Sequence, residues 1–242
     1  VGRQHKVVLT GECADEVFGG YPWFHREEFL QSGTFPWTPD LAPRKMLLLD
    51  EVRESLPMDA FVQEMYDRSV REVTILPGED EIETNRRQIG YLNIRYFMQT
   101  LLNRMDRTSM HSGLEARVPF ADRALVDYIF NVPWEMKAKD GLVKNVLRQA
   151  SRGLLPDEIL FRRKSPYPKS YETLLGTRLQ QEIEDSKAPI LQIVDRKKVQ
   201  KFIDSTKDYG KPWYGQLMAG PQMLAYLLQI NYWLKTYSVE LI

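Results

Sequence analysis

The chain has 242 residues, a length typical of one globular domain or of one large part of a bigger protein. Hydrophobic residues make up 43% of it and charged residues 27%, which excludes a wholly disordered or fibrous chain. Thirty-three basic residues balance 33 acidic ones, so no net charge attracts nucleic acid or an anionic membrane. The one cysteine, Cys13, excludes an internal disulfide and a cysteine-rich zinc site. We therefore expect a cytoplasmic protein with neither nucleic acid nor membrane as a partner.

The first predicted element is a strand close to the N-terminus. The apolar run at residues 7–9 is typical of a strand in a parallel sheet, and no second run of comparable β-branched character follows it. A lone parallel strand is unstable because its backbone groups lack partners. Two interpretations stay open: a short edge strand of a mainly helical domain, or the C-terminal part of a larger α/β domain with its other strands upstream.

Helical periodicity dominates the rest of the chain after a predicted loop at residues 31–43. The longest pattern runs from about Asp80 to Met110, with apolar residues at steps of three to five, and Gly113 ends it. Asp122 is expected to cap another helix. Shorter helices are predicted at 43–52, 58–76, 142–150, 171–185, 195–205 and 221–237. We therefore predict a mainly α chain with one or two short strands.

The segment from Thr10 to Tyr21 follows the predicted strand and is rich in carboxylates. Glu12, Asp15 and Glu16 lie within about one helical turn of the strand. Like charges so close are costly unless a cation or a basic substrate neutralises them, and ligands of α/β sheets bind beyond the carboxyl ends of strands. The alternative is a solvated acidic helix start that the helix dipole favours.

Two basic groups are candidate partners for an anionic ligand. Arg104 and Arg107 lie near the end of the long helix, with Arg117 just beyond it, and guanidinium groups bind carboxylate and phosphate in bidentate fashion. The segment 144–169 could stabilise a phosphate-rich ligand or a developing anion. The alternative for both groups is a set of surface or helix-capping cations. The basic residues of the second group are Lys144, Arg148, Arg152, Arg162, Arg163, Lys164 and Lys169.

Taken in this order, the motifs resemble the synthetase domain of class B, glutamine-dependent asparagine synthetases. The family's loop reads approximately SGEGADEvFGGY, and here it is TGECADEVFGGY. Its second block is matched by DRTSMHSGLEARVPFAD, and its third by the segment from Lys144 to Lys164. The resemblance covers about residues 6–170, whereas 171–242 fits the family's variable helical tail only loosely. It implies the C-terminal part of an α/β adenine-nucleotide α-hydrolase-like domain, the class with a pyrophosphatase loop.

The resemblance also implies an activity and a set of substrates. Such enzymes use ATP and Mg²⁺ to activate aspartate as β-aspartyl-adenylate, and ammonia from glutamine then gives asparagine, AMP and pyrophosphate. A homodimer is one possible assembly. The implied site residues are Glu12, Lys144, Arg104 and Arg117 for catalysis, Thr10 and Gly11 for the nucleotide, Asp15 for magnesium, and Glu16 for the substrate. Among them Lys144 would face the phosphates, and Glu12 could take a proton from the attacking nitrogen as general base.

Some features depart from the family pattern. Cys13 and Thr10 replace a Gly and a Ser, changes that we expect to be tolerated. The family's pyrophosphate loop, SGGxDS, and its N-terminal glutaminase domain have no counterpart in these residues. We therefore expect part of a synthetase, inactive in isolation. The alternatives are a related β-lactam synthetase or peptide cyclase, of which the β-lactam formers carry Tyr where Glu12 stands, and a non-catalytic helical interaction module.

Overall fold

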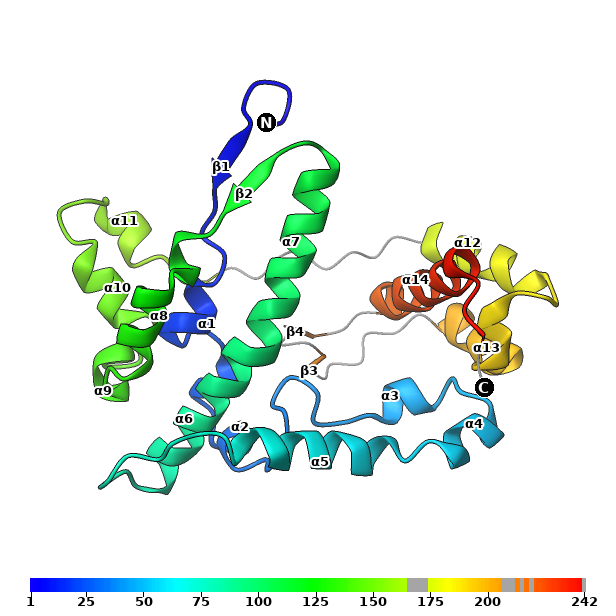
Figure 1. Ribbon diagram of the computed structural model, residues 1–242, viewed down its shortest axis with the longest axis horizontal. Helices are drawn as coiled ribbons and strands as arrows, with labels where there is room; N and C mark the ends of the chain where they lie inside the picture. Colours follow the sequence, from blue (N-terminus) through cyan, green and yellow to red (C-terminus); the bar gives the residue numbers. More distant parts are fainter. Residues whose placement is uncertain (165–173, 206–211, 214–215, 218–219, 241–242) are drawn as a thin grey trace. The chain divides into compact units, whose positions relative to one another are not determined.

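A computed structural model describes residues 1–164, 174–205, 212–213, 216–217 and 220–240. The chain divides into two compact units, of which the first comprises residues 1–36 and 65–164 and the second comprises 37–64 and 165–242. Helices predominate in both (Figure 1). The prediction of a mainly α chain is therefore confirmed. No helix among the described residues is long and apolar enough to cross a bilayer.

The first unit contains the motif-bearing segments. In chain order its elements are β1 (Val7–Leu9), α1 (Ala14–Phe18), η1 (Pro22–Phe24), α2 (Glu27–Leu30), α6 (Glu81–Leu92), η2 (Asn93–Met98), α7 (Gln99–His111), β2 (Glu115–Arg117), η3 (Pro119–Ala121), α8 (Arg123–Phe130), α9 (Trp134–Lys137), α10 (Asn145–Ala150) and α11 (Asp157–Leu160). The division between the units falls inside α5 (Met58–Val70).

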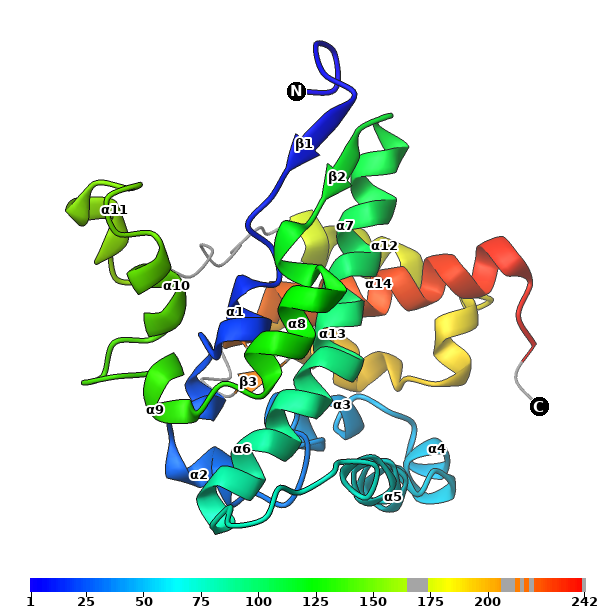
Figure 2. The same ribbon diagram turned by 60° about the vertical axis from the view of Figure 1, so that its left-hand side comes forward.

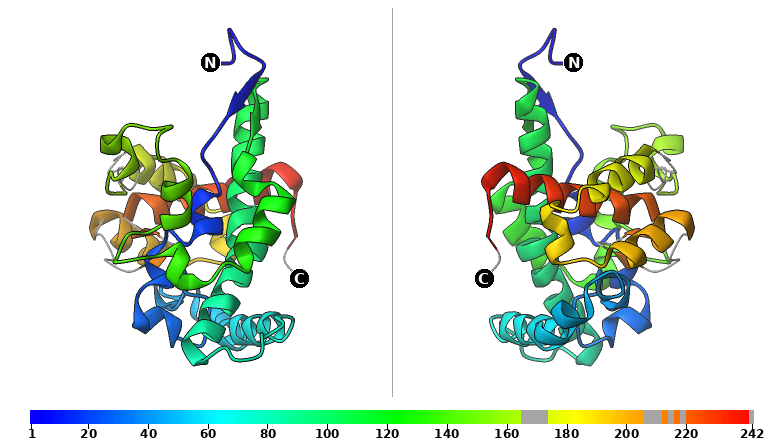
Figure 3. Two further views of the ribbon diagram at one scale, coloured as in Figure 1. Left: turned by 90° about the vertical axis from the view of Figure 1, so that its left-hand side faces the viewer. Right: turned by 90° about the vertical axis from the view of Figure 1, so that its right-hand side faces the viewer.

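The described residues of the second unit are helical apart from one very short strand pair. Its elements are α3 (Ala42–Lys45), α4 (Asp50–Ser55), α12 (Leu174–Glu184), η4 (Pro189–Gln192), α13 (Arg196–Ser205), β3 (Pro212–Trp213), β4 (Gln216–Leu217) and α14 (Gly220–Tyr237). Strands β3 and β4 pair antiparallel and were not predicted. Helices α12, α13 and α14 pack around one apolar core, and Figure 3 shows them from two sides.

The predicted strand at residues 7–9 is confirmed as β1, and its partner is a strand that the sequence pattern did not reveal. β1 and β2 pair in parallel, with Val8 opposite Ala116. Figures 1 and 2 show both strands beside the end of α7. β2 reads Glu-Ala-Arg, so it lacks the β-branched residues on which the prediction relied. Val7 and Leu9 of β1 are open to solvent, with Leu9 69% exposed, whereas Val8 is half-buried.

The longest predicted helix is also confirmed, as the continuous run α6–η2–α7. It begins at the cap residue Asp80, whose carboxylate accepts a hydrogen bond of 2.8 Å from the Glu83 N–H. The run is interrupted by η2, a π-helical turn, which is a rare conformation often found near functional sites. Gly113 follows its end with φ of 65°, in the left-handed region that glycine adopts without strain.

Several predicted helix boundaries were wrong. The predicted helix 43–52 is split into α3 and α4 because the backbone between them bonds to residues 193–195. Helix α5 ends at Val70 and α10 starts only at Asn145, because Lys144 has a left-handed backbone with φ of 57°. The first residues of the predicted helix 171–185 lie outside the described residues. The remaining helices were placed within a few residues, and the Asp122 cap is confirmed by a 3.1 Å bond from the Leu125 N–H.

The core of the first unit positions the segment after β1. Helix α1 buries Val17 and Phe18 against Met98 of η2 and Ile129 of α8, and Cys13 joins the same cluster. Because α1 packs against both η2 and α8, its position in the unit is fixed. The carboxylates of Asp15 and Glu16 within it are therefore held in place. Its end is fixed by Gly19, with φ of 70°, which stops the helix as predicted.

Candidate active site

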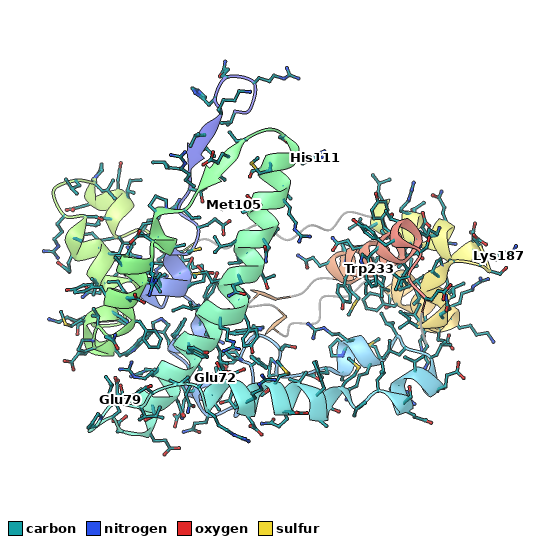
Figure 4. All side chains as sticks on the ribbon, viewed as in Figure 1. Glu72, Glu79, Met105, His111, Lys187 and Trp233 are labelled. Atoms are coloured by element: carbon teal, nitrogen blue, oxygen red, sulfur yellow. The ribbon has the colours of Figure 1, made fainter. Side chains whose placement is uncertain are left out.

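The candidate site begins at Thr10, where β1 ends. Its hydroxyl accepts a 3.0 Å hydrogen bond from the Glu12 N–H, which turns the chain out of the strand direction. The same hydroxyl contacts Met105 Sδ at 3.7 Å, and Figure 4 labels Met105 on α7. The Thr10 N–H donates to the Arg117 carbonyl at 3.0 Å, so the loop start is held by both β2 and α7.

Cys13 occupies a strained backbone position just before α1. Its φ is 73°, a left-handed value that costs about 1–2 kcal/mol for a residue with a Cβ. Its side chain is buried, and burial raises the pKa of the thiol to about 12, with the charges of Glu16 and Glu12 adding to the effect. Burial of the Cys13 side chain opposes this backbone strain, and tolerance of Cys in place of Gly stays a prediction.

Glu12 pairs with a cation from the long helix. The distance from Arg104 Nη2 to Glu12 Oε1 is 3.2 Å, although the two residues are far apart in the sequence. The glutamate side chain is mostly shielded, whereas about half of the arginine side chain is open to solvent. The structure thus brings together two residues that were predicted to be catalytic, and it leaves the guanidinium accessible to a ligand.

Asp15 pairs with two cations from the basic segment. Lys144 Nζ lies 2.9 Å and Lys164 Nζ 3.2 Å from Asp15 Oδ1. Lys164 also sits over the ring of Tyr21, 4.1 Å from its centroid, a cation–π contact. A Cβ added at Gly20 would lie 1.8 Å from Asp15 Oδ1 and 2.5 Å from Lys144 Cε. Only glycine therefore leaves room for this ion pair.

Glu16 differs from the other two carboxylates because it is buried, with 3% of its surface exposed. It accepts a 2.5 Å hydrogen bond from the Tyr21 hydroxyl. Burial raises the pKa of Glu16, while the Tyr21 hydrogen bond partly opposes that rise. The Asn93 side chain donates to the Glu16 carbonyl at 3.3 Å, which ties α1 to the π-helical turn. In this structure Glu16 connects α1 to Tyr21 and, through its carbonyl, to Asn93, and its role toward substrate stays a prediction.

The remaining predicted residues lie at the strand ends. Arg117 is exposed, and its Nε lies 2.8 Å from Glu115 Oε1 on the same strand. Gly11 has open space where a Cβ would stand, so a ligand could approach its backbone closely. No contact among the described residues links the Arg117 side chain to Glu12, Asp15 or Lys144.

The three carboxylates therefore do not form one cluster. Each points to a different partner, so the repulsion expected from the sequence is relieved by Arg104, by the two lysines and by burial. Within the described ranges, no group of three or more His, Cys, Asp or Glu side chains could hold a metal ion. The arrangement is a row of paired charges with accessible cations, a surface suited to an anionic ligand.

Sequence reasoning missed three residues of this arrangement. Lys164 was counted only as one of the basic segment, and neither Tyr21 nor Gly20 was assigned to the site. The hydrogen bond between Tyr21 and Glu16 could have been predicted from the sequence. A short helix followed by two glycines reverses the chain direction, which brings Tyr21 back toward Glu16. The approach of Lys164 had no local signal, because it depends on how α10 and α11 fold back.

Comparisons with known proteins point to one family. The model of the asparagine synthase family matches residues 1–235. Glutamine-hydrolyzing asparagine synthetase 3 of Bacillus subtilis is 43% identical over the whole chain, and the match covers 40% of that protein. Asparagine synthetase 1 of the same organism is 25% identical over 67% of the chain and 30% of its own length. Amidase chry2 of Gibberella zeae is 26% identical over 67% of the chain and 32% of its own length.

The chain spans less than half the length of these relatives. The family match nevertheless extends from the first residue through most of α14, well beyond the motif-bearing part. It confirms the predicted adenine-nucleotide α-hydrolase-like fold and extends the relationship into a tail for which the motifs were uninformative. On the strength of this match, the chain belongs to the asparagine synthase family.

Proposed function

We propose that the chain carries the amide-forming half of a glutamine-dependent asparagine synthetase. In this reaction ATP activates aspartate as β-aspartyl-adenylate, and ammonia then displaces AMP to give asparagine. The observation that carries the proposal is the pair of ion pairs in the segment after β1, where Glu12 meets Arg104 and Asp15 meets Lys144. The 43% identity to a Bacillus subtilis protein of that name supports the same substrates.

Adenylate formation brings a carboxylate and a triphosphate together, so cations must offset their repulsion. Lys144 and Lys164 already share one carboxylate oxygen, and each retains N–H donors for phosphate oxygens. Arg104 and Arg117 are exposed and could bind substrate carboxylate or released pyrophosphate in bidentate fashion. Thr10 and Gly11 would contact the nucleotide at the strand end.

Amide formation requires that the attacking ammonia nitrogen lose a proton. Glu12 is the acceptor we assign, because its carboxylate lies beyond the strand end and is held by Arg104. The hydrogen bond from Arg104 to Oε1 orients the Glu12 carboxylate. The other carboxylate oxygen, Oε2, remains to accept the proton of the incoming nitrogen. A Gln at this position would keep the shape without accepting a proton.

Magnesium fits this site only together with ATP. Asp15 offers one carboxylate, and two ammonium groups already surround it, so these side chains alone do not make a cation site. Mg²⁺ is commonly held by one or two carboxylates and substrate phosphates. We therefore assign Asp15 as a ligand whose remaining oxygen partners would come from ATP and water, where the metal would neutralise phosphate charge.

Further parts of the proposal rest on the family alone. Glutamine would supply the ammonia through an amidotransferase domain outside these residues, and the motif-bearing part would be residues 6–170 with a helical tail at 171–242. A cytoplasmic location and a homodimer complete this proposal.

The test is a product assay on the protein in its native length. With ATP, aspartate and either ammonia or glutamine, asparagine and AMP should form in equal amounts. Formation of ADP in place of AMP, or no dependence on aspartate, would refute the proposed reaction. An amide formed from another carboxylate, with aspartate inert, would favour a related synthetase.

A further inference from the structure

One cavity of the first unit borders α1 and includes Glu16 of the candidate active site in its wall. It measures about 330 Å³, at the lower end of the range for small-molecule sites. Its walls come from α6, from the loop at 76–79, from the segment between α8 and α9, and from Glu16 to Gly19 at the end of α1. Neither Glu12, Arg104, Asp15 nor Lys144 is among its lining residues.

Two of the three cations that line this cavity are already paired. Arg86 Nη1 lies 3.1 Å from Glu83 Oε1, and Arg87 Nη2 lies 2.6 Å from Glu79 Oε1. Glu79 is labelled in Figure 4, in the loop that leads into α6. Within each of these ion pairs the positive and negative charges offset each other. The charge of the third cation is not offset in this way.

That third cation is Lys137, at the end of α9. Its Nζ donates one hydrogen bond of 3.2 Å, to the Phe130 carbonyl at the end of α8, and it makes no ion pair with a carboxylate among the described residues. An ammonium group has three donors, so two remain. The nearby Arg86 Nε is buried and has no hydrogen-bond partner among those residues either. The cavity therefore offers unused donors from two cationic side chains.

The remaining charged groups do not neutralise Lys137. Glu16 turns its carboxyl group to Tyr21, which is not a lining residue. His25 bonds the Gly19 carbonyl at 2.8 Å, and burial lowers the pKa of His25, which favours its neutral form. Burial also lowers the pKa of Lys137 to about 8, with the Arg87 charge adding to this and Glu83 opposing it.

The rest of the lining is aromatic and apolar apart from Asn131, whose Oδ1 accepts a 3.1 Å hydrogen bond from Arg87. Phe24 and Trp134 stack with ring centroids 5.6 Å apart, and Arg86 lies over the Trp134 ring at 5.0 Å. Phe130 forms another part of the wall beneath Arg87. One unpaired positive charge beside aromatic rings suits a ligand with a single negative group and an apolar body.

We propose that this cavity is a binding site for a small aromatic or apolar monocarboxylate, whose carboxylate accepts hydrogen bonds from Lys137 and Arg86. The proposed synthetase reaction does not require this site, because Glu16 is the one candidate active-site residue that lines the cavity and its carboxyl group turns to Tyr21. Its occupant would contact α1, the helix that carries Asp15.

The experiment is calorimetric titration of the full chain with phenylacetate, without ATP or aspartate. We expect saturable binding at pH 7, and no binding of phenylacetamide, which has the same shape without the charge. Because a carboxylate binds the protonated lysine, affinity should fall by at least about tenfold between pH 7 and pH 9.5. Lys137→Met should weaken binding about 10- to 100-fold at pH 7.

Two further variants separate the site from fold effects and from the active site. Lys137→Arg keeps the charge without titrating in this range, so it should bind equally at both pH values. Lys144→Ala should bind phenylacetate as the unaltered chain does. The proposal is overturned if phenylacetate does not bind at pH 7, if phenylacetamide binds equally well, or if Lys137→Met and Lys137→Arg have the same affinity.

Discussion

The two units bury polar side chains in different ways. Asn231 in α14 has a partner at each end of its amide, because it accepts from the Ile190 N–H at 3.2 Å and donates to Glu182 at 3.0 Å. Asn93 in the first unit is equally buried, yet its Oδ1 has no hydrogen-bond partner among the described residues. Asn93 donates to the carbonyl of the buried Glu16, and the strained Cys13 precedes the same helix α1.

The difference indicates that the second unit is organised for stability and the first for a site. Polar groups left unsatisfied and non-glycine residues in left-handed conformations cost free energy, and they persist where function requires them. Cys13 and Lys144 both have positive φ, and both adjoin Asp15 or Glu12. Substitutions in the second unit should therefore change stability alone, whereas those in the first should separate stability from activity.

The largest effect is expected in the core of the second unit. Leu179 in α12 is 0% exposed, so Leu179→Ala should lower the free energy of unfolding by about 2–5 kcal/mol. Leu174→Ala on the same helix is the matched control, because Leu174 is 68% exposed, and it should cost less than about 0.5 kcal/mol. Denaturant unfolding measures both. Adenylate formation by Leu179→Ala should be unchanged under conditions where the variant stays folded. A loss of adenylate formation by the folded variant would contradict the proposed difference between the two units.

The next effect concerns the room that Gly20 leaves for the ion pair of Asp15 and Lys144. Gly20→Ala places a Cβ within 1.8 Å of the carboxylate and must displace it. A displacement of this size should slow adenylate formation about 100-fold. Gly153→Ala is the control, since Gly153 has open space around it, and its positive φ of 76°, which Gly20 lacks, adds backbone strain alone. It should lose about 1 kcal/mol of stability and no activity, and equal losses of activity in both variants would contradict the prediction.

A smaller effect is expected from the buried carboxyl of Glu16. Its pKa is raised in the folded chain, so the folded state holds the proton more tightly than the unfolded state. Stability contributed by this group is complete below the unfolded pKa and is lost as pH rises through the folded pKa. Glu16→Gln should therefore flatten the fall in stability just above pH 4.5. Unfolding measured from pH 4 to pH 8 tests this, and an unchanged slope would mean that the buried carboxyl does not titrate differently on folding.

The smallest effect should come from Cys13. Cys13→Gly relieves the left-handed backbone but loses a buried side chain, so its net effect should lie within about 1 kcal/mol of zero. Cys13→Ala keeps the strain and should be the less stable of the two variants. Thermal unfolding of both gives the difference, and greater stability of the alanine variant would show that φ at this position is not strained.

The sequence predicted those elements that local patterns determine. The strand at residues 7–9, the long helix and the Asp122 cap each depend on residues close in the chain, and all were placed correctly. β2 was missed because its stability comes from pairing with β1 and from contact with α7, not from its own composition. The split between α3 and α4 likewise depends on residues 193–195.

The candidate site shows the same division. Motif resemblance selected Glu12, Asp15, Lys144 and Arg104, and the structure brings them together in two ion pairs. The sequence could not indicate which cation meets which carboxylate, because those pairs join segments that are distant in the chain. The same distance hid Lys164, whose contact with Asp15 depends on the return of the chain after α11.

The central claim is that Lys144 and Glu12 act at successive steps of one amide-forming reaction. The most direct measurement compares aspartate-dependent ATP–pyrophosphate exchange with asparagine production in Lys144→Ala and Glu12→Gln, in the protein at its native length. Lys144→Ala should lose both activities. Glu12→Gln should keep exchange at least in part, while asparagine production falls about 10²–10⁴-fold. Loss of exchange in Glu12→Gln as complete as in Lys144→Ala, or full asparagine production by Glu12→Gln, would contradict the account.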